Sequence, residues 1–202
     1  MPGSNITKRV LAQTFKELVC RESFEKVSVS DICDACQVSR KTFYYHFQDK
    51  YALMEWIFET EFVNVMRDDP VQDRWAIIDA LCQYLYRERK YYGKLMQFQG
   101  QNSFRRYFHD FLFSFVERFI TLEPDVIREI AGNGSITPEE TQAFYSRFLA
   151  DAVLIAVFRW LSEGTQIPAG EFVGLLRRTD DLIRLRASKP AEEPPEEETV
   201  TG

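Results

Sequence analysis

Residues 28–50 read SVSDICDACQVSRKTFYYHFQDK, and their spacing predicts two short helices joined by a tight turn. The first helix shows apolar side chains at the i, i+3, i+4, i+7 positions of one helical face, at Val29, Ile32, Cys33 and Cys36. Ser28 is placed to cap its N-terminus, and Asp31 stands where a longer Glu or Gln usually completes the cap. Gln37-Val38 interrupts the pattern, so we expect the turn there.

The second short helix begins after Ser39 and buries Phe43 and Phe47, which lie one turn apart. Its other side is polar and aromatic, at Arg40, Lys41, Tyr44, Tyr45 and His46. Two helices arranged in this way make a helix-turn-helix, whose second helix must offer one face to a DNA groove ~12 Å wide. The cations of its first turn are placed where such proteins contact base edges. The tyrosine hydroxyls, the histidine ring and Lys50 suit phosphate oxygens, which position the protein without reading sequence.

The same residues resemble the N-terminal signature of the TetR family of bacterial transcriptional regulators, over about residues 6–60. The most specific part is Thr-Phe-Tyr-Tyr-His-Phe at 42–47, followed by Asp49-Lys50. The resemblance implies base contacts from Arg40, Lys41 and Tyr44, and it implies contacts with the DNA backbone from Ser28, Ser39, Thr42, Tyr45, His46 and Lys50. It also implies an all-helical homodimer on double-stranded DNA with a palindromic operator, an effector-binding C-terminal domain and a dimer interface made by the last two long helices.

The sequence departs from the family pattern inside the helix-turn-helix. Cys33 and Cys36 occupy places where the family usually has alanine, and Gln37 stands in the turn where a small glycine is usual. A left-handed backbone at Gln37 is less comfortable for glutamine than for glycine, because a side chain crowds the following carbonyl. We therefore expect the departures to affect how the second short helix, after Ser39, packs against the first rather than which residues face DNA.

The remainder of the chain predicts helices almost throughout. The full chain of 202 residues is 45% hydrophobic and 14% aromatic, with 17 Phe and only 9 Gly and 8 Pro, a composition that favours a helical interior with large side chains. We expect an all-α fold, in which an N-terminal three-helix helix-turn-helix DNA-binding domain (1–50) precedes a helical effector-binding and dimerisation domain (51–186). Residues 187–202 combine Pro, Glu and Thr without apolar periodicity, which predicts an acidic, disordered and solvated tail.

Charge differs along the chain. The net charge is −6 overall, but residues 1–50 carry +2 and residues 187–202 carry −4. A mildly basic first quarter fits a DNA-binding head, and it equally fits an uneven surface charge. The longest apolar run, 152–158, is seven residues, whereas a bilayer needs ~20. No apolar segment precedes the first charges, so we expect no secretion signal, no membrane partner, reduced cysteines and a cytoplasmic location.

An aromatic cluster in the second domain is a candidate lining for an effector pocket, since such pockets are mostly apolar and aromatic. Its members are Tyr84, Tyr91, Phe98, Phe104, Phe108, Phe111 and Phe115. Each of them could equally be ordinary core. Residues 85–163 resemble the dihydroxyacetone-kinase regulator branch of the TetR family, through the stretches 101–105 and 147–161. That resemblance implies a C-terminal domain that answers to a partner protein rather than, or besides, a small molecule.

The last two long helices combine small and large apolar residues, which suits a dimer seam because small residues allow close helix approach. The candidates are Phe148, Ala152, Ile155, Ala156, Trp160, Phe172, Leu175 and Leu176. A bundle closed within one chain is the alternative. The helix-turn-helix favours the dimer, because one head makes too few contacts to select a site and dimers repeat it at ~34–36 Å.

Sites for catalysis or metal are weakly indicated. Cys33 and Cys36 form a C-x-x-C, but a closed zinc site needs four ligands and only one such pair exists. Both cysteines lie on the predicted buried stripe, where free cysteine is commonly apolar filler, so we expect no metal and no cofactor. His46 and His109 are the only histidines, and neither has a nucleophile beside it. His46 either contacts phosphate or merely closes its helix.

We therefore predict a TetR-type dimeric DNA-binding transcriptional regulator, not an enzyme, whose operator affinity is modulated by a small-molecule or protein effector bound to the C-terminal domain. Repression and activation remain equally open. The alternative is a TetR-fold protein–protein adaptor or coregulator without DNA binding of its own, against which the retained Arg40, Lys41, Tyr45 and Lys50 argue.

Overall fold

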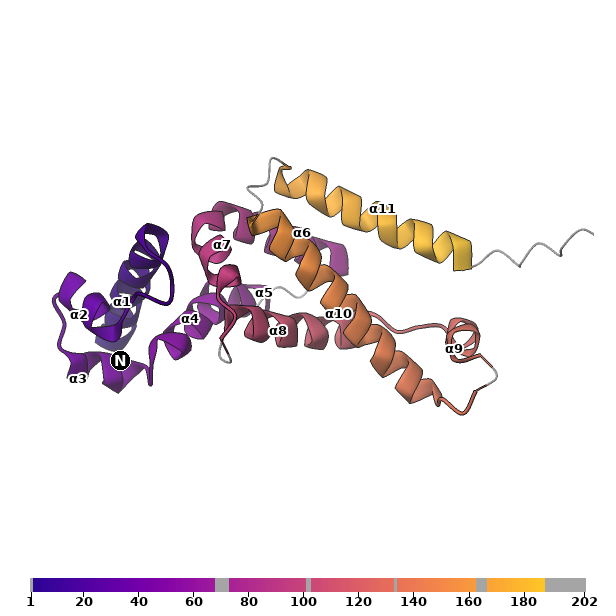
Figure 1. Cartoon of the computed structure of the whole chain (residues 1–202), viewed down its shortest axis with the longest axis horizontal. Helices are drawn as coiled ribbons and strands as arrows, with labels where there is room; N and C mark the ends of the chain where they lie inside the picture. Colours follow the sequence, from indigo (N-terminus) through magenta and orange to yellow (C-terminus); the bar gives the residue numbers. More distant parts are fainter. Residues whose placement is uncertain (1, 68–72, 101–102, 133, 163–166, 188–202) are drawn as a thin grey trace, which may run out of the picture.

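The computed structural model describes residues 2–67, 73–100, 103–132, 134–162 and 167–187, and it is all-helical, with no strand in those residues (Figure 1). This confirms the predicted fold class. The helices are α1 (Pro2–Arg21), α2 (Val29–Ala35), α3 (Arg40–His46), α4 (Lys50–Phe58), the π-helical turn η1 (Glu59–Val63), α5 (Asn64–Arg67), α6 (Arg74–Arg87), α7 (Arg89–Gln97), α8 (Phe104–Phe119), α9 (Pro124–Ala131), α10 (Pro138–Ser162) and α11 (Ala169–Ala187). None of these helices is both long and apolar enough to cross a membrane.

Helices α1, α2 and α3 form a compact head at one end of the molecule (Figure 1). Their contact is apolar: Leu11 and Phe15 of α1, Ile32 of α2 and Phe43 of α3 are fully buried. Asp49 caps the start of α4, because one of its carboxylate oxygens accepts hydrogen bonds at 2.8 Å from the backbone amides of Tyr51 and Ala52. The cap at Asp49 therefore marks the position at which the head ends and α4 begins.

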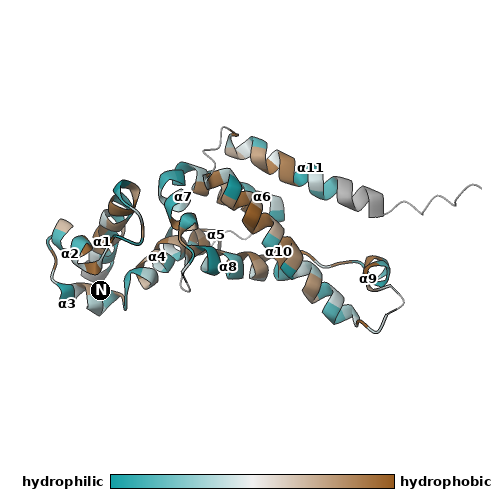
Figure 2. Cartoon of the chain, viewed as in Figure 1, coloured by the Kyte–Doolittle hydropathy of each residue, from teal (hydrophilic) through white to brown (hydrophobic). Residues whose placement is uncertain are grey.

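The body comprises the helices from α4 to α11, and its core is rich in aromatic rings. Phe58 at the end of α4 lies at the centre, with the rings of Phe104, Phe108 and Phe111 of α8 at centroid distances of 5.2–5.8 Å. Helix α10 packs along α8 and α7, whereas α11 packs on α6. Figure 2 shows hydrophobic residues along α10, which reaches from α7 to the far end of the body.

The π-helical turn changes which residues face the core. Apolar periodicity alone predicts one buried helical face that runs through Met54, Ile57, Phe58, Phe62 and Val65. Phe62 is buried, but Val65 is 56% exposed. A π-helical turn holds about one residue more than an α-helical turn, so the positions beyond it rotate away from the buried face. The amide of Asn64 donates to the carbonyl of Glu59, which is the i→i+5 bond that closes this wider turn.

Helix α9 lies between two turn signals in the sequence, Glu-Pro at 123–124 and Gly-Asn-Gly at 132–134. Pro124 occupies its first turn, and Gly132 ends it with a positive φ of 60°. None of its residues is buried. The next helix begins with a capping box: Thr137 and Glu140 cap α10 reciprocally, with backbone-to-side-chain bonds of 2.8 and 3.2 Å. Of the predicted acidic tail, all but Ala187 lies outside the described residues.

Candidate nucleic-acid interface

The N-terminus of α2 is fixed by a reciprocal cap. The hydroxyl of Ser28 accepts from the backbone amide of Asp31 at 3.2 Å, and the Asp31 carboxylate accepts from the backbone amide of Ser28 at 2.8 Å. The same carboxylate accepts the Ser28 hydroxyl at 2.6 Å. These bonds hold the pKa of Asp31 below its ordinary value, the side-chain bond contributing most. The predicted cap is confirmed, and the Ser28 hydroxyl hydrogen is already committed to Asp31.

The turn between α2 and α3 has the strained backbone that the sequence predicts. Gln37 has a φ of 56° and is the one non-glycine residue with a positive φ in the described part of the chain. The left-handed conformation costs roughly 1–2 kcal/mol for a residue with a side chain. The amide of Val38 donates to the Cys33 carbonyl at 3.0 Å, which fastens the turn to the end of α2. Gln37 and this hydrogen bond together determine the direction in which the chain enters α3.

Helix α3 presents a polar and aromatic face to solvent. Phe43 is fully buried and Phe47 nearly so, as predicted, whereas Arg40, Lys41 and Tyr44 are exposed and Tyr45 is 81% exposed. Two large aromatic rings in water on a seven-residue helix are unfavourable unless another surface covers them. The Tyr45 and His46 rings meet edge to face at 4.9 Å, so the half-buried His46 both closes the helix and supports Tyr45.

Two further polar contacts position the start of α3. The Ser39 hydroxyl caps the helix by accepting from the amide of Thr42 at 3.0 Å, and the two hydroxyls lie 2.8 Å apart. One hydroxyl donates to the other, so a single hydrogen of this pair stays available to an external acceptor. The Arg40 guanidinium donates to the hydroxyl of Ser30 on α2. That bond holds the Arg40 side chain beside the turn, within the exposed face.

Lys50 requires a correction. Its ammonium was predicted to contact a DNA phosphate, but it donates to the carbonyls of Phe24, Glu25 and Val27 at 2.8, 3.2 and 2.8 Å. An ammonium has three hydrogens, and all three are used. Burial lowers the pKa of Lys50, while the negative charges of Glu25 and Asp31 oppose that effect. Lys50 is therefore a structural cation that ties the loop before α2 to the start of α4.

Cys33 of α2 and Cys36, which follows the helix as its C-cap, are free thiols packed within the head. Cys33 is buried and Cys36 is half-buried, and the Cys36 thiol donates to the carbonyl of Ile32 at 2.9 Å. Desolvation raises the pKa of both thiols. Both positions thus lie on the inward stripe that the spacing predicts.

Most of the predicted aromatic pocket is core instead. Tyr84, Tyr91, Phe104 and Phe108 are buried against other rings. Phe98 lies at the junction between head and body, 5.0 Å from the Phe24 ring. Apolar periodicity identifies a buried face, but it does not show whether that face borders a cavity. The sequence therefore does not separate core residues from pocket-lining residues in this cluster. Phe111 and Phe115 alone of the predicted set line the body cavity.

That cavity is a groove of about 380 Å³ between α6, α8, α10 and α11. Its walls are almost wholly apolar, with Ile78 and Leu81 from α6, Phe111 and Phe115 from α8, and Val153 from α10. Sequence reasoning missed the contribution of α6, although Ile77, Ile78, Leu81 and Cys82 fall on one helical face. At one end of the groove Arg74 and Asp180 form an ion pair at 3.1 Å.

The predicted dimer residues fall into three groups according to their burial. Trp160 and Phe172 are buried and stack on each other at 4.4 Å, so they join α10 to α11 within one chain; Ala156 and Leu176 are half-buried. The others face solvent at Phe148, Ala152, Ile155 and Leu175. Phe144, which the sequence reasoning missed, is 67% exposed and stacks on Phe148, itself 60% exposed, at 6.3 Å. We call Phe144, Phe148, Ala152, Ile155 and Leu175 the exposed apolar face.

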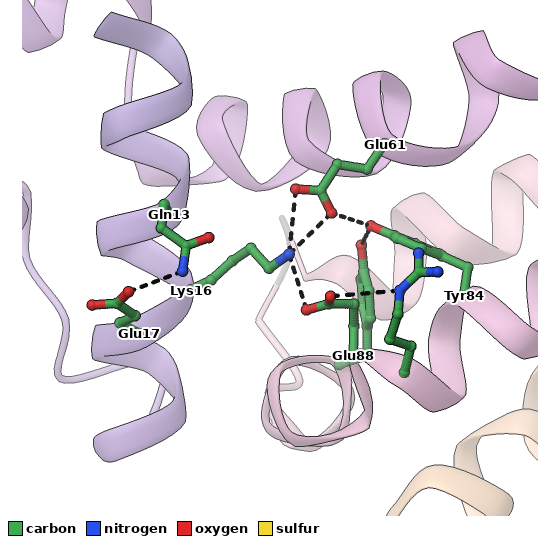
Figure 3. Close-up of polar contacts among 8 residues, drawn as sticks. Gln13, Lys16, Glu17, Glu61, Tyr84 and Glu88 are labelled. Atoms are coloured by element: carbon green, nitrogen blue, oxygen red, sulfur yellow. Dashed lines mark hydrogen bonds and ion pairs between the residues drawn. The ribbon is translucent and has the colours of Figure 1, made fainter. Parts of the chain in front are cut away.

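Head and body are joined by a polar cluster (Figure 3). The Lys16 ammonium of α1 lies 3.0 Å from a Glu61 carboxylate oxygen and 2.9 Å from one of Glu88. The Tyr84 hydroxyl donates to Glu61 at 2.9 Å and lies 2.5 Å from the Tyr92 hydroxyl. Burial is the main cause that raises the pKa of both tyrosines. A cation of the head thus reaches two acids of the body, and sequence spacing gave no sign of this cluster.

A capped helix-turn-helix head on an all-helical body defines the class of helix-turn-helix transcriptional regulators. The pattern for bacterial regulatory proteins of the tetR family matches residues 16–57, and the pattern for a transcriptional regulator C-terminal region matches residues 73–179. The chain belongs to the TetR family of transcriptional regulators.

Individual relatives agree with this assignment. Over 96 residues the chain is 33% identical to the HTH-type dhaKLM operon transcriptional activator DhaS of Lactococcus lactis, covering 47% of this chain and 51% of that one. The chain therefore spans about half the length of this curated relative.

Solved structures share the fold. The dihydroxyacetone kinase operon activator DhaS is 23% identical, with a TM-score of 0.59 over 88% of this chain and 97% of that one. A TetR transcriptional regulator from Streptococcus agalactiae is 17% identical, with a TM-score of 0.60 over 88% and 95%. NalD, the secondary repressor of the MexAB-OprM multidrug efflux pump in Pseudomonas aeruginosa, is 20% identical, with a TM-score of 0.56 over 90% and 96%.

Proposed function

We propose that this TetR-family regulator binds double-stranded DNA as a homodimer, with the two α3 helices in successive major grooves of an inverted-repeat operator. The observation that carries the proposal is the exposed polar face of α3. Arg40 and Lys41 lie in its first turn, where helix-turn-helix proteins reach base edges. Tyr44 lies one turn further along the same face, and Tyr45 is placed to meet the phosphate backbone.

The remaining predicted contacts keep a smaller role in this proposal. The Ser39 and Thr42 pair can offer one hydroxyl hydrogen to a phosphate. His46 stays a candidate for direct contact with the phosphate backbone of DNA. Ser28 can act only as an acceptor or by positioning α2, because its hydroxyl hydrogen goes to Asp31. The phosphate contact from Lys50 is withdrawn.

Dimerisation is proposed through the exposed apolar face on α10 and α11. Five apolar residues, two of them phenylalanines, would otherwise remain in water, which monomers seldom tolerate over a continuous patch. A two-fold interface also suits the head, since one α3 contacts too few bases to select a site. Effector binding in the body would alter the spacing of the two heads and so the operator affinity, by ~1–3 kcal/mol in typical allosteric coupling.

The test is selection from a random duplex library with the purified chain, run beside the double variant Lys41→Ala, Tyr45→Ala. The matched control is Lys90→Ala, an exposed lysine on α7 and therefore outside the helix-turn-helix. We expect the wild type and the control to enrich the same inverted repeat and the double variant to enrich none. Failure of the wild type to enrich any sequence at low salt would contradict DNA binding and favour the adaptor alternative.

A further inference from the structure

A second recess lies on the surface of the body, where the start of α8 packs against α10. Its volume is about 560 Å³. Among the described residues, its lining has no member in common with the apolar groove or with the exposed apolar face. We call it the arginine site, and its main lining residues are Ser103, Arg105, Arg106, His109, Asp151 and Leu154.

The arginine site carries more positive than negative charge. Arg105 and Arg106 form no ion pair with an acid in the described part of the chain. Asp151 is the one acid among the described lining residues, and its carboxylate lies 3.1 Å from Nε2 of His109. The Asp110 side chain, 3.4 Å from Nδ1 of the same ring, is 72% exposed and outside the lining. Two guanidinium groups therefore stand against one carboxylate, so the site favours an anion even with a neutral His109.

Arg105 is held in place without using its hydrogen-bond donors. Its guanidinium lies 4.7 Å from the centre of the Phe158 ring on α10, a cation–π contact that draws it toward the joint between the two helices. Its N–H groups have no hydrogen-bond acceptor among the residues that the structure describes. A guanidinium carries five such donors in a planar fork, which matches the oxygens of an oxyanion.

Ser103 adds a buried donor to the arginine site. It is 5% exposed, and its hydroxyl caps α8 by accepting from the backbone amide of Arg106 at 3.4 Å. The hydroxyl hydrogen itself has no acceptor within the described ranges. An unused buried donor costs free energy, so a ligand oxygen at this position would be stabilised. The N-terminus of the 16-residue α8 carries a partial positive charge, which adds to the attraction for an anion.

We propose that the arginine site binds a small phosphorylated molecule through its phosphate group. Two forked guanidinium groups and a capping hydroxyl are three separate donor groups, which suit the three terminal oxygens of a phosphate monoester better than the two oxygens of a carboxylate. The volume of about 560 Å³ leaves room for the rest of such a molecule. The inference goes beyond the proposed function, because it requires neither DNA binding nor a dimer.

The experiment is a calorimetric titration of the full chain with methyl phosphate and, separately, with acetate. Both titrations are run near neutral pH, where a phosphate monoester is mostly dianionic. They are also run at one fixed ionic strength, so that screening of the charges is the same in each. We expect one methyl phosphate to bind per chain, roughly tenfold more tightly than acetate or better.

Variants of α8 locate the bound phosphate. Arg106→Gln removes an exposed guanidinium and should weaken methyl phosphate binding roughly 5–10-fold, between the values for an exposed ion pair and a charge-assisted hydrogen bond. Arg106→Lys keeps the charge but not the fork, so it should recover only part of the affinity. Ser103→Asp keeps a capping side chain but adds a negative charge, so binding should be lost.

The matched control is Arg118→Gln, an exposed arginine in the last turn of the same helix, whose methyl phosphate affinity should equal that of the wild type. Circular dichroism and urea unfolding establish that each variant is folded.

The DNA backbone offers the same phosphate chemistry, so a second arm separates the two sources. The head variant Lys41→Ala, Tyr45→Ala should bind methyl phosphate as the wild type does, because the arginine site lies outside the helix-turn-helix. A short duplex of arbitrary sequence should not displace methyl phosphate from this head variant. Displacement would assign the site to the DNA backbone and overturn the proposed small-molecule ligand.

Three further outcomes would overturn the inference. Absence of methyl phosphate binding, or equal affinity for acetate, would contradict the ligand class. Wild-type affinity in folded Arg106→Gln and folded Ser103→Asp would place the anion elsewhere. An equal loss in Arg118→Gln and Arg106→Gln would show a general effect of charge. Failure of the duplex selection described above would leave all these readouts intact, so the two proposals fail separately.

Discussion

The ammonium of Lys16 lies 2.9 Å from a carboxylate oxygen of Glu88, and this ion pair joins the first helix of the head to the corner between α6 and α7 of the body. The same ammonium also reaches Glu61. Helix α6 carries groove-lining residues at its start and Tyr84 near its end. One helix therefore connects the groove to the acids that hold the head.

Replacing Lys16 by Met should loosen this connection. Glu61 would then lose its cation, and among the described residues Glu88 would keep only the exposed Arg87 guanidinium at 3.9 Å, so we expect a loss of about 1–3 kcal/mol in the free energy of unfolding, between the values for exposed and buried pairs. Urea unfolding measures the loss, and the exposed Lys26→Met is the matched control on the same head. An unchanged unfolding midpoint would mean that the head is held by apolar contacts alone.

The tyrosines behind Lys16 give a contrasting pair of predictions. The Tyr92 hydroxyl is bonded to Tyr84, whereas the buried Tyr91 hydroxyl has no hydrogen-bond partner within the described part of the chain. Tyr92→Phe should cost about 1 kcal/mol, and Tyr91→Phe should be neutral or stabilising by up to ~1 kcal/mol, because it removes an unpaired buried polar group. Thermal unfolding of the two variants decides; a destabilised Tyr91→Phe would indicate a bonded hydroxyl.

Local signals in the sequence were sufficient for the head. The caps at Ser28, Ser39 and Asp49 use residues within three positions of each other, and Phe43 and Phe47 lie on one short face, so periodicity and capping chemistry predict them directly. The strained Gln37 follows from the same local pattern. Each of these features depends on neighbours in the chain.

Features that join distant segments were not predictable in this way. Lys50 meets carbonyls more than twenty positions earlier, and Lys16 meets acids on two other helices. The aromatic run of α8 predicts burial but not which rings border a void, since that depends on how α6 and α11 pack opposite it. The sequence alone does not show whether a cation faces DNA or a backbone carbonyl. Nor does it show whether an aromatic ring borders a cavity or is packed in the core.

The cap of α2 predicts an acid dependence of stability. The folded state lowers the pKa of Asp31 below 3.8, so between the folded pKa and 3.8 the unfolded chain binds more protons. The stabilisation is then fully present above 3.8 and is lost as the pH falls through the folded pKa. Asp31→Asn removes this dependence. The urea midpoints of the variant and the wild type should therefore approach each other as the pH falls from 3.8 through the folded pKa of Asp31.

The control for this effect is Asp34→Asn, an exposed acid on the same helix without a capping role. Its difference from the wild type should not shrink over the same pH range. A difference between wild type and Asp31→Asn that stays constant through the window would show that the carboxylate is not held by Ser28.

The three carbonyl bonds of Lys50 lead to opposite expectations for stability and for DNA binding. Lys50→Met leaves the Phe24 and Val27 carbonyls without their donor, so the free energy of unfolding should fall by roughly 1–3 kcal/mol. Where the variant is folded, the salt dependence of operator affinity should keep its wild-type slope. Lys41→Ala should leave the free energy of unfolding unchanged and weaken operator binding, because Lys41 is a proposed base contact on the exposed first turn of α3. Urea unfolding and binding titrations at several salt concentrations measure both quantities, and a reduced slope in Lys50→Met with unchanged stability would restore the phosphate contact.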